Sequence, residues 1–257
     1  MKRRIFLGLS TLGLACGWVG VMAPDRQSLR QGKHRLRTAG QVAMNAWLKL
    51  NTDGYVDLLM SKAEMGQGVH TALAMLVAEE MDLPLNRIRL EDARIDRVYG
   101  NVAALAEGVP FRPDNQQGLV QSVRWLMRRV MNSMGIMMTG GSSSVKDLWL
   151  PLREAAALTR QSMLETLARH WQVPADAIRV HAGEFHASKA DKNLHLPFGQ
   201  VVGLLLEAPV LAKQFNLKAT KDFSTVGQAT HRRDSFAKVN GTAQYGIDVR
   251  LPGQMFA

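Results

Sequence analysis

Apolar residues recur at two spacings along the first half of the chain, and each spacing predicts a different element. Alternating apolar positions over 47–50 and 55–60 flank the polar stretch 51–54, which predicts a hairpin with a four-residue turn. Between 63 and 81 the apolar side chains recur every three or four positions, as in a helix with one buried face. Residues 87–92 alternate again. The expected order is therefore strand, turn, strand, loop, helix, strand.

Helical patterns dominate the second half of the chain. Three-and-four spacing extends over 115–134 and 146–170, and a shorter helix is expected over 196–206. Residues 178–187 have the pattern of a small hairpin. The stretch 99–114 contains two prolines and three Gly or Asn residues, which favours a long loop. Loops of that length in a compact domain usually serve function or lie disordered.

Two features of the long helical patterns have structural interpretations. The three arginines of the first pattern, Arg124, Arg128 and Arg129, are expected to form a solvated face. In the second pattern Pro151 is expected near the first turn, where a missing backbone N–H is tolerated.

The net charge of +10 comes mainly from the first 40 residues, which hold eight Lys or Arg against one acidic residue. The rest of the chain carries 24 basic and 21 acidic residues. It shows no basic stripe with interleaved aromatic residues, which is the usual footprint of nucleic-acid binding. We therefore expect no nucleic-acid partner.

Residues 1–23 have the pattern of an export signal. Arg3 and Arg4 precede Ile-Phe-Leu, and an apolar run continues to about Ala23. This order resembles a twin-arginine signal, which predicts export to the periplasm. The alternative is an ordinary signal or an uncleaved N-terminal membrane anchor, and Pro24 at the expected cut should hinder processing. Residues 24–40 would form a basic connector.

Cysteine and histidine usage excludes several kinds of site. Cys16 is the sole cysteine, so the chain can form no internal disulfide and no cysteine-ligated iron–sulfur or zinc site. Lipidation of Cys16 is disfavoured because glycine stands where a lipoprotein signal has leucine. The seven histidines show neither i, i+4 pairs nor carboxylates at ligand spacing, and His181 and His186 are expected at the surface.

A glycine-flanked glutamine, Gly66-Gln67-Gly68, opens the helical pattern at 63–81. Without a Cβ at Gly66 and Gly68, the backbone can approach a bound group closely. The first N–H groups of a helix have no internal partner and lie at its positive end, beside which Gln67 would place an amide. The alternative is a tight turn with no ligand.

A second glycine-rich segment, Gly140-Gly-Ser-Ser-Ser144, stands at the start of the helical pattern over 146–170. Free N–H groups, hydroxyls and a helix dipole aimed at one point suit a phosphate or pyrophosphate. A plain serine N-cap is the structural alternative.

The segment from Glu64 to Glu80, EMGQGVHTALAMLVAEE, resembles the cofactor-contacting segment of the xanthine oxidase family of molybdenum hydroxylases. Within that family the chain is most similar to the large subunits of isoquinoline 1-oxidoreductase and related periplasmic aldehyde dehydrogenases. The resemblance implies an α+β fold, and a Gln67 that hydrogen-bonds a terminal molybdenum ligand. It also implies that the dinucleotide tail of molybdopterin cytosine dinucleotide contacts Gly141, Ser142, Ser143 and Ser144.

The resemblance also implies a domain order. Residues 41–225 would form a molybdopterin-binding domain, and 226–257 resemble the opening of an a/b hammerhead domain, with an unpaired strand at 245–249. Only about the first third of a family large subunit is covered. The general-base glutamate of the family is absent, so no catalytic residue is assigned and no residue is expected to ligate the metal directly.

Two functions follow from this resemblance. The first is the cofactor-binding portion of a periplasmic oxidoreductase that oxidises an aldehyde or N-heterocycle with water as oxygen donor. Its implied partners are a small subunit carrying [2Fe-2S] clusters, a cytochrome c acceptor, and a downstream chain that supplies the rest of the large subunit. The second is a truncated, non-catalytic exported domain.

Overall fold

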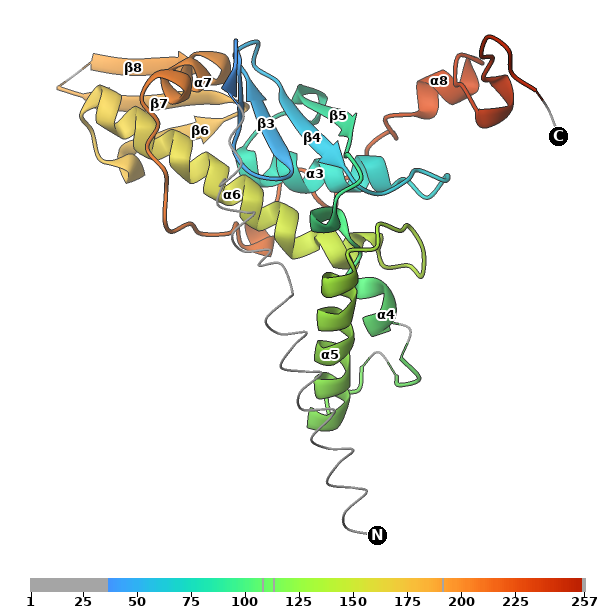
Figure 1. The fold of residues 1–257 in the computed structure, drawn as a ribbon. Coiled ribbons are helices and arrows are strands. Elements are labelled where there is room, and N and C mark those ends of the chain that lie inside the picture. Colours follow the sequence, from blue (N-terminus) through green and yellow to red (C-terminus); the bar gives the residue numbers. More distant parts are fainter. Residues whose placement is uncertain (1–36, 108, 113, 191, 256–257) are drawn as a thin grey trace. The chain divides into compact units, whose positions relative to one another are not determined.

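The computed structural model describes residues 37–107, 109–112, 114–190 and 192–255, and shows an α+β fold, as the resemblance implied (Figure 1). The chain divides into two compact units, Met1–Gly227 and Gln228–Ala257. The predicted export signal and the first part of the basic connector fall outside the described residues.

A five-stranded sheet forms the centre of the first unit. Its strands are β1 (Arg37–Thr38), β2 (Gln41–Ala43), β3 (Leu48–Asn51), β4 (Val56–Met60) and β5 (Ile88–Asp92), in the spatial order of the sequence. Neighbouring strands are antiparallel from β1 to β4, while β5 is parallel to β4. The predicted hairpin and the strand after the helix are confirmed. The basic connector was expected to extend to residue 40, but its last residues belong to this sheet.

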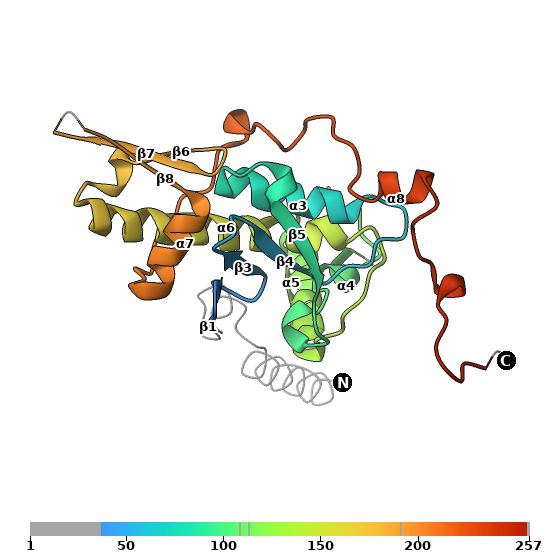
Figure 2. The ribbon, with the colours of Figure 1, turned by 90° about the horizontal axis from the view of Figure 1, so that it is seen from above.

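Two helices pack together against the sheet. Helix α3 (Val69–Met81) connects β4 to β5, and it lies along α6 (Ser144–Trp171) (Figures 1 and 2). Large apolar side chains from all three elements are fully buried in one core: Trp47, Leu48, Leu50, Leu58, Leu73, Leu152, Met163 and Leu167. The three-and-four spacing of both helices is thus explained by burial of one face.

Pro151 lies inside α6 and not near its first turn, contrary to the expectation. The helix begins at Ser144, two residues earlier than the apolar spacing indicated. The proline ring removes the N–H that would have donated to the carbonyl of Asp147, so α6 lacks one hydrogen bond there.

A second sheet of three antiparallel strands follows α6. Its strands are β6 (Arg179–His181), β7 (Glu184–Lys189) and β8 (Lys192–Pro197), and it leads into α7 (Phe198–Glu207). The predicted hairpin therefore has a third strand. The sequence did not reveal β8 because its apolar alternation is limited to Leu194 and Leu196, which are only half-buried. The helix predicted over 196–206 is confirmed, and His181 and His186 are exposed as expected.

The stretch predicted as a long loop contains α4 (Ala103–Glu107) between η2 (Arg97–Tyr99) and α5 (Gly118–Met134). Asn101 starts α4, because its side-chain oxygen accepts from the N–H groups of Ala103 and Ala104, each at 3.1 Å. Figures 1 and 2 show α5 running away from the sheet, across the direction of α6.

Arg124 on α5 is buried, so the prediction of a solvated arginine face is wrong for this residue. Its guanidinium donates to the carbonyls of Asn115, at 3.0 Å, and Arg112, at 2.8 Å. These bonds hold the end of the preceding loop against the helix.

An extended segment at 208–227 runs back along α6 and is held by acidic residues at the end of α3. Glu79, whose side chain is 1% exposed, accepts from the consecutive N–H groups of Ser224 (3.0 Å), Thr225 (2.6 Å) and Val226 (3.0 Å). Burial alone would raise the pKa of Glu79. The donors at Val226 and Thr225 and the ammonium of Lys218 outweigh burial and hold that pKa below its usual value.

A neighbouring buried pair fixes the same segment from the other side. Arg153 of α6 donates to Glu80 at 2.7 Å and to the carbonyl of Lys218 at 2.7 Å. The N–H of Lys218 in turn donates to Glu80 at 3.1 Å. α3, α6 and the extended segment are therefore joined by charged groups that each have partners.

The second unit contains α8 (Ser235–Val239) and η5 (Gly246–Asp248). The strand expected at 245–249 is wrong, since the described part of 228–255 contains no strand. A single strand would leave its ladder groups unpaired. Instead the N–H of Tyr245 donates to the carboxylate of Asp248 at 2.9 Å, which closes a turn.

Within residues 37–255, gaps excepted, none of the helices is both long enough and apolar enough to cross a membrane.

Candidate functional site

The loop before α3 has the open backbone that its glycines predicted. Gly66 has a φ of 103°, and Gly68 is the N-cap of α3 with a φ of 79°. A Cβ built at either glycine would meet no atom within 4 Å, so the loop borders open space. Gln67 is exposed, but its amide folds back on the loop: Oε1 accepts from the N–H of Met65 at 2.5 Å, and Nε2 donates to the carbonyl of Ala63 at 2.8 Å.

Glu64 occupies the anion position that the sequence analysis had left for a ligand. Its Oε1 accepts from the N–H groups of Gly66 (2.9 Å) and Gly68 (2.8 Å), and its Oε2 accepts from that of His70 at 3.1 Å. The donors at the start of α3 were expected to be free, and these three are engaged by the protein's own carboxylate. This role of Glu64 was not expected from the sequence, although a glutamate just before a helix often interacts with the free N–H groups at the helix start.

The second glycine-rich segment divides into an exposed and a buried part. Gly141 and Ser142 are exposed with φ values of 61° and 52°, and Ser144 is half-buried at the first position of α6. Ser143 is fully buried: its hydroxyl donates to the carbonyl of Gly140 at 2.6 Å and accepts from the amide of Asn101 at 2.7 Å. The hydroxyl of Ser143 thus holds the loop together, while Gly141, Ser142 and Ser144 are accessible.

Buried contacts bring the two segments together. Lys62, which precedes the first loop, pairs with Asp147 in the first turn of α6 at 2.8 Å, with both side chains at most 1% exposed. Asp147 also accepts from the N–H of Val102 at 2.9 Å. Closer to the loops, the N–H of Ala63 donates to the hydroxyl of Thr139 at 2.8 Å. The two predicted segments, 85 residues apart at this pair, therefore begin from one fixed base.

The accessible residues of both segments suit a bound group whose polar atoms face the main chain of the two loops. A Cβ at Gly141, like one at Gly66 or Gly68, would meet no atom within 4 Å. Such cradles let main-chain donors approach phosphate oxygens. Among the described residues, no group of three or more His, Cys, Asp or Glu side chains could hold a metal ion.

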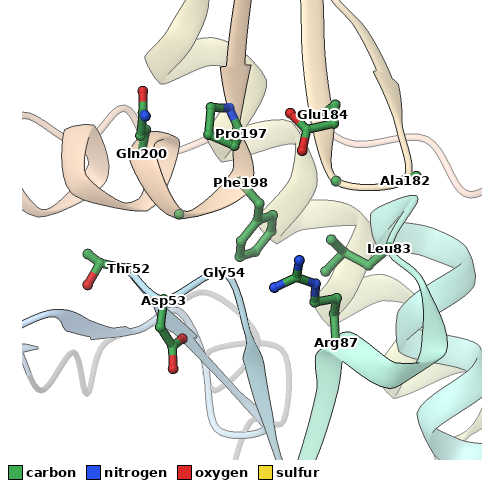
Figure 3. A pocket seen from close by; sticks show the side chains of 12 residues that line it. Thr52, Asp53, Gly54, Leu83, Arg87, Ala182, Glu184, Pro197, Phe198 and Gln200 are labelled. Atoms are coloured by element: carbon green, nitrogen blue, oxygen red, sulfur yellow. The ribbon is translucent and has the colours of Figure 1, made fainter.

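A separate hollow of about 300 Å³ lies where the two sheets meet (Figure 3). It is bordered by the turn between β3 and β4, the residues after α3, the turn between β6 and β7, and the start of α7. Arg87 lines it with its guanidinium 5.2 Å from the ring of Tyr55. None of the seven predicted site residues lines this hollow, so it is separate from the site that the sequence motifs predict.

One histidine pair was not foreseen from the sequence. His186 and His195 face each other across β7 and β8 with ring centroids 4.8 Å apart, and His195 lies 2.6 Å from a carboxylate oxygen of Glu184. Both histidines are exposed and lie on the second sheet, which contains none of the predicted site residues.

Comparison with known proteins provides an independent line of support. Residues 8–106 match the family model described as "Molybdopterin cofactor-binding domain". That range contains the Gly66-Gln67-Gly68 loop and all five strands of the first sheet, while the Gly140–Ser144 segment falls outside it.

Three curated proteins are similar to this chain. The beta subunit of isoquinoline 1-oxidoreductase from Brevundimonas diminuta is 28% identical over all of this chain and 33% of its own length. A membrane-bound aldehyde dehydrogenase [pyrroloquinoline-quinone] from Gluconacetobacter polyoxogenes is 28% identical over 82% of this chain and 23% of its own. A nicotinate dehydrogenase subunit from Pseudomonas putida is 27% identical over 81% of this chain and 14% of its own.

The chain thus spans at most a third of these relatives, all of which are oxidoreductases by name. Among solved structures, quinoline 2-oxidoreductase from Pseudomonas putida 86 aligns with 61% of this chain and 15% of its own, at 17% identity and a TM-score of 0.36. The sequence matches agree with the resemblance that was stated for the segment from Glu64 to Glu80.

Proposed function

We propose that this chain, a relative of the molybdenum hydroxylase large subunits, is the cofactor-binding portion of an exported oxidoreductase. The observation that carries the proposal is the joining of the two glycine-rich segments at the Lys62–Asp147 pair. Because their stems share one base, a single elongated cofactor can contact both loops.

Within this proposal, Gly66, Gln67 and Gly68 hold the pterin end of molybdopterin cytosine dinucleotide near its metal. Gly141, Ser142 and Ser144 contact the dinucleotide tail through main-chain N–H groups and hydroxyls. Ser143 supports the tail segment from inside, through Asn101. Once bound, the molybdenum cofactor would supply the redox chemistry that hydroxylates an aldehyde or N-heterocycle with oxygen from water.

Gln67 must reorient to take part. Its amide now bonds to Met65 and Ala63 in its own loop, and both bonds connect exposed groups. Exposed hydrogen bonds contribute little net free energy, so a ligand that offers the amide a partner can replace them.

Export and the partner subunits are part of the same proposal. The twin-arginine pattern at residues 3–7 would carry the folded, cofactor-loaded protein to the periplasm. Electrons would leave through a small [2Fe-2S] subunit, since Cys16 alone cannot hold a cluster, and then through a cytochrome c acceptor. Two of the relatives are named as subunits, which supports a multi-subunit enzyme.

The decisive measurement is the molybdenum and pterin content of the full chain, purified from the periplasm of a host that makes the cofactor. We expect near-stoichiometric amounts, reduced several-fold by Gln67→Ala and by Ser144→Ala. Ser188→Ala, at an exposed serine on β7, is the matched control and should leave the content unchanged.

A folded protein without molybdenum or pterin would contradict the proposal. That result would favour the second candidate, a non-catalytic exported domain. A circular-dichroism spectrum of the same sample separates this outcome from simple unfolding.

A further inference from the structure

Helix α5 carries an apolar stripe that stays partly exposed in the described structure. Leu119, Val123, Leu126, Val130 and Met134 follow one another at intervals of four, three, four and four residues, so they share one face of the helix. Leu119 is 75% exposed and Met134 51% exposed. The three residues between them are half-buried. We call these five residues the α5 seam.

The seam continues toward the candidate site. After Met134 and the helix end at Gly135, Ile136 is 40% exposed and Met138 is 39% exposed. The next residues are Thr139 and Gly140, which lead into the second glycine-rich segment. A polypeptide that covers the seam and these two residues would therefore lie beside the loop proposed to hold the cofactor tail.

The charge of α5 indicates what kind of partner fits. The helix contains three arginines and no acidic residue. Arg124 is used internally, whereas Arg128 is exposed and Arg129 half-buried. Arg129 lies three residues after Leu126, beside the seam, with its guanidinium 5.3 Å from the ring of Trp125. A partner with an apolar stripe flanked by carboxylates would match this surface.

The relatives indicate where such a partner comes from. This chain spans 33% of the isoquinoline 1-oxidoreductase subunit that it matches, and smaller shares of the other two. In proteins of that length, the remaining two thirds must pack against surfaces of this portion. An apolar stripe of about four helical turns, exposed at both ends and half-buried between them, is the kind of surface that such packing buries.

We propose that the α5 seam is the docking face for the polypeptide that corresponds to the remaining part of the large subunit, contributed through a helix with an apolar stripe and acidic flanks. The inference rests on the proposed function, because the identity of the partner comes from the same relationship. The seam spans about 22 Å of helix at 1.5 Å per residue, which three heptads of a facing helix would cover.

The seam can be tested on the full chain with a synthetic three-heptad peptide that has leucine at the a and d positions and glutamate at e and g. We expect this peptide to bind in a fluorescence-anisotropy titration, and the same peptide with lysine in place of glutamate to bind at least about tenfold more weakly. Leu126→Glu should weaken binding of the glutamate peptide by a similar factor. Ile95→Glu, at an isoleucine that is 97% exposed outside the seam, should not.

A charge reversal guards against a variant that merely misfolds. Arg129→Glu should favour the lysine peptide over the glutamate peptide, a reversal that loss of structure cannot produce. Equal binding of the two peptides to the unaltered chain, or failure of both to bind, would overturn the proposal.

Two other occupants give distinct results. Binding to phosphatidylglycerol vesicles that Leu126→Glu abolishes, with no peptide binding, would identify a membrane-facing helix and overturn the proposal. Concentration-dependent dimerisation in sedimentation that Leu126→Glu abolishes would identify a second copy and also overturn it. Peptide binding requires no cofactor, so a chain that binds the glutamate peptide but contains no molybdenum would contradict the proposed function while leaving the docking face in place.

Discussion

Lys62 and Asp147 form an ion pair with 2.8 Å between Nζ and Oδ2, and neither side chain is exposed by more than 1%. Lys62 precedes the loop at 66–68, and Asp147 lies in the first turn of α6. The pair is therefore a buried contact that helps to fix the relative placement of the two candidate segments, together with the bond from the N–H of Ala63 to the hydroxyl of Thr139.

Removing one member of this pair should be strongly destabilising. Lys62→Met leaves the carboxylate of Asp147 buried without its ammonium, which typically costs about 3–5 kcal/mol. Asp147→Asn in addition removes the charge but keeps an oxygen for the N–H of Val102, so the double variant should recover part of the loss. Urea unfolding of the two single variants and the double variant measures this coupling. Strict additivity of the three free-energy changes would show that the pair contributes nothing specific.

Glu79 should control how firmly the extended segment at 208–227 is held. Glu79→Gln removes the charge that accepts from three backbone N–H groups and Lys218, and should lower the free energy of unfolding by about 2–3 kcal/mol. Glu91→Gln is the control, because its pair with Lys49 is only half-buried, with side chains 27% and 41% exposed, and should be worth less than about 1 kcal/mol. A loss at Glu79 no larger than that at Glu91 would contradict this account.

The same residue predicts a pH dependence. The pKa of Glu79 is lowered in the folded state, so the unfolded chain binds the proton more tightly. The stabilisation is therefore fully present above the ordinary glutamate pKa, near 4.5, and is lost as the pH falls from there through the folded-state pKa. Unfolding free energies measured at pH 7 and at steps below pH 5 should converge for the unaltered chain and Glu79→Gln.

Ser143 and Ser144 are adjacent but should respond to substitution in different ways. Ser143→Ala removes a buried hydroxyl from between Gly140 and Asn101 and should cost about 1–3 kcal/mol of stability. Ser144→Ala should change the free energy of unfolding by less than about 0.5 kcal/mol, because substitutions of accessible residues usually have effects of this size. It should nevertheless lower the cofactor content. Thermal unfolding together with molybdenum analysis separates the two effects. Equal behaviour of the two variants in both measurements would refute the division between support and contact.

Gly199 and Gly203 on α7 offer a matched pair for close packing. A Cβ at Gly199 would lie 2.2 Å from the carbonyl oxygen of Thr52, a backbone atom that cannot move aside alone. Gly199→Ala should therefore destabilise the contact between α7 and the turn after β3 by about 1–3 kcal/mol or more. Gly203→Ala meets no atom within 4 Å and should stabilise the helix by about 0.5–1 kcal/mol. Denaturant unfolding of both variants measures these changes in the free energy of unfolding. Changes of the same sign for the two variants would contradict the geometry.

Local patterns predicted the elements whose burial repeats along the chain. The hairpin before α3, the helix α3 itself and strand β5 alternate or repeat their apolar side chains, so their periods are visible in the sequence. Strand β8 was missed because its apolar alternation is limited to Leu194 and Leu196, and helix α4 was missed because it depends on the cap from Asn101.

The candidate site was only partly accessible to sequence reasoning, because its key contacts join residues distant in the chain. Lys62 and Asp147 are 85 positions apart, and Asn101 and Ser143 are 42 apart. No spacing rule connects such residues. The glycine motifs could be recognised from local backbone requirements, whereas the burial of Ser143 and of Arg124 followed only from the tertiary structure.

The carboxylate of Glu64 has a consequence for whatever binds at the start of α3. It already neutralises the N–H groups of Gly66, Gly68 and His70, so a second anion at this position must displace Glu64. Loading is then an exchange of one acceptor for another and not a simple addition. Small free anions would compete poorly with a tethered carboxylate, whereas a large ligand held at several points can drive the exchange. We therefore expect the loop to discriminate against simple phosphate and to favour a ligand that also reaches the second segment.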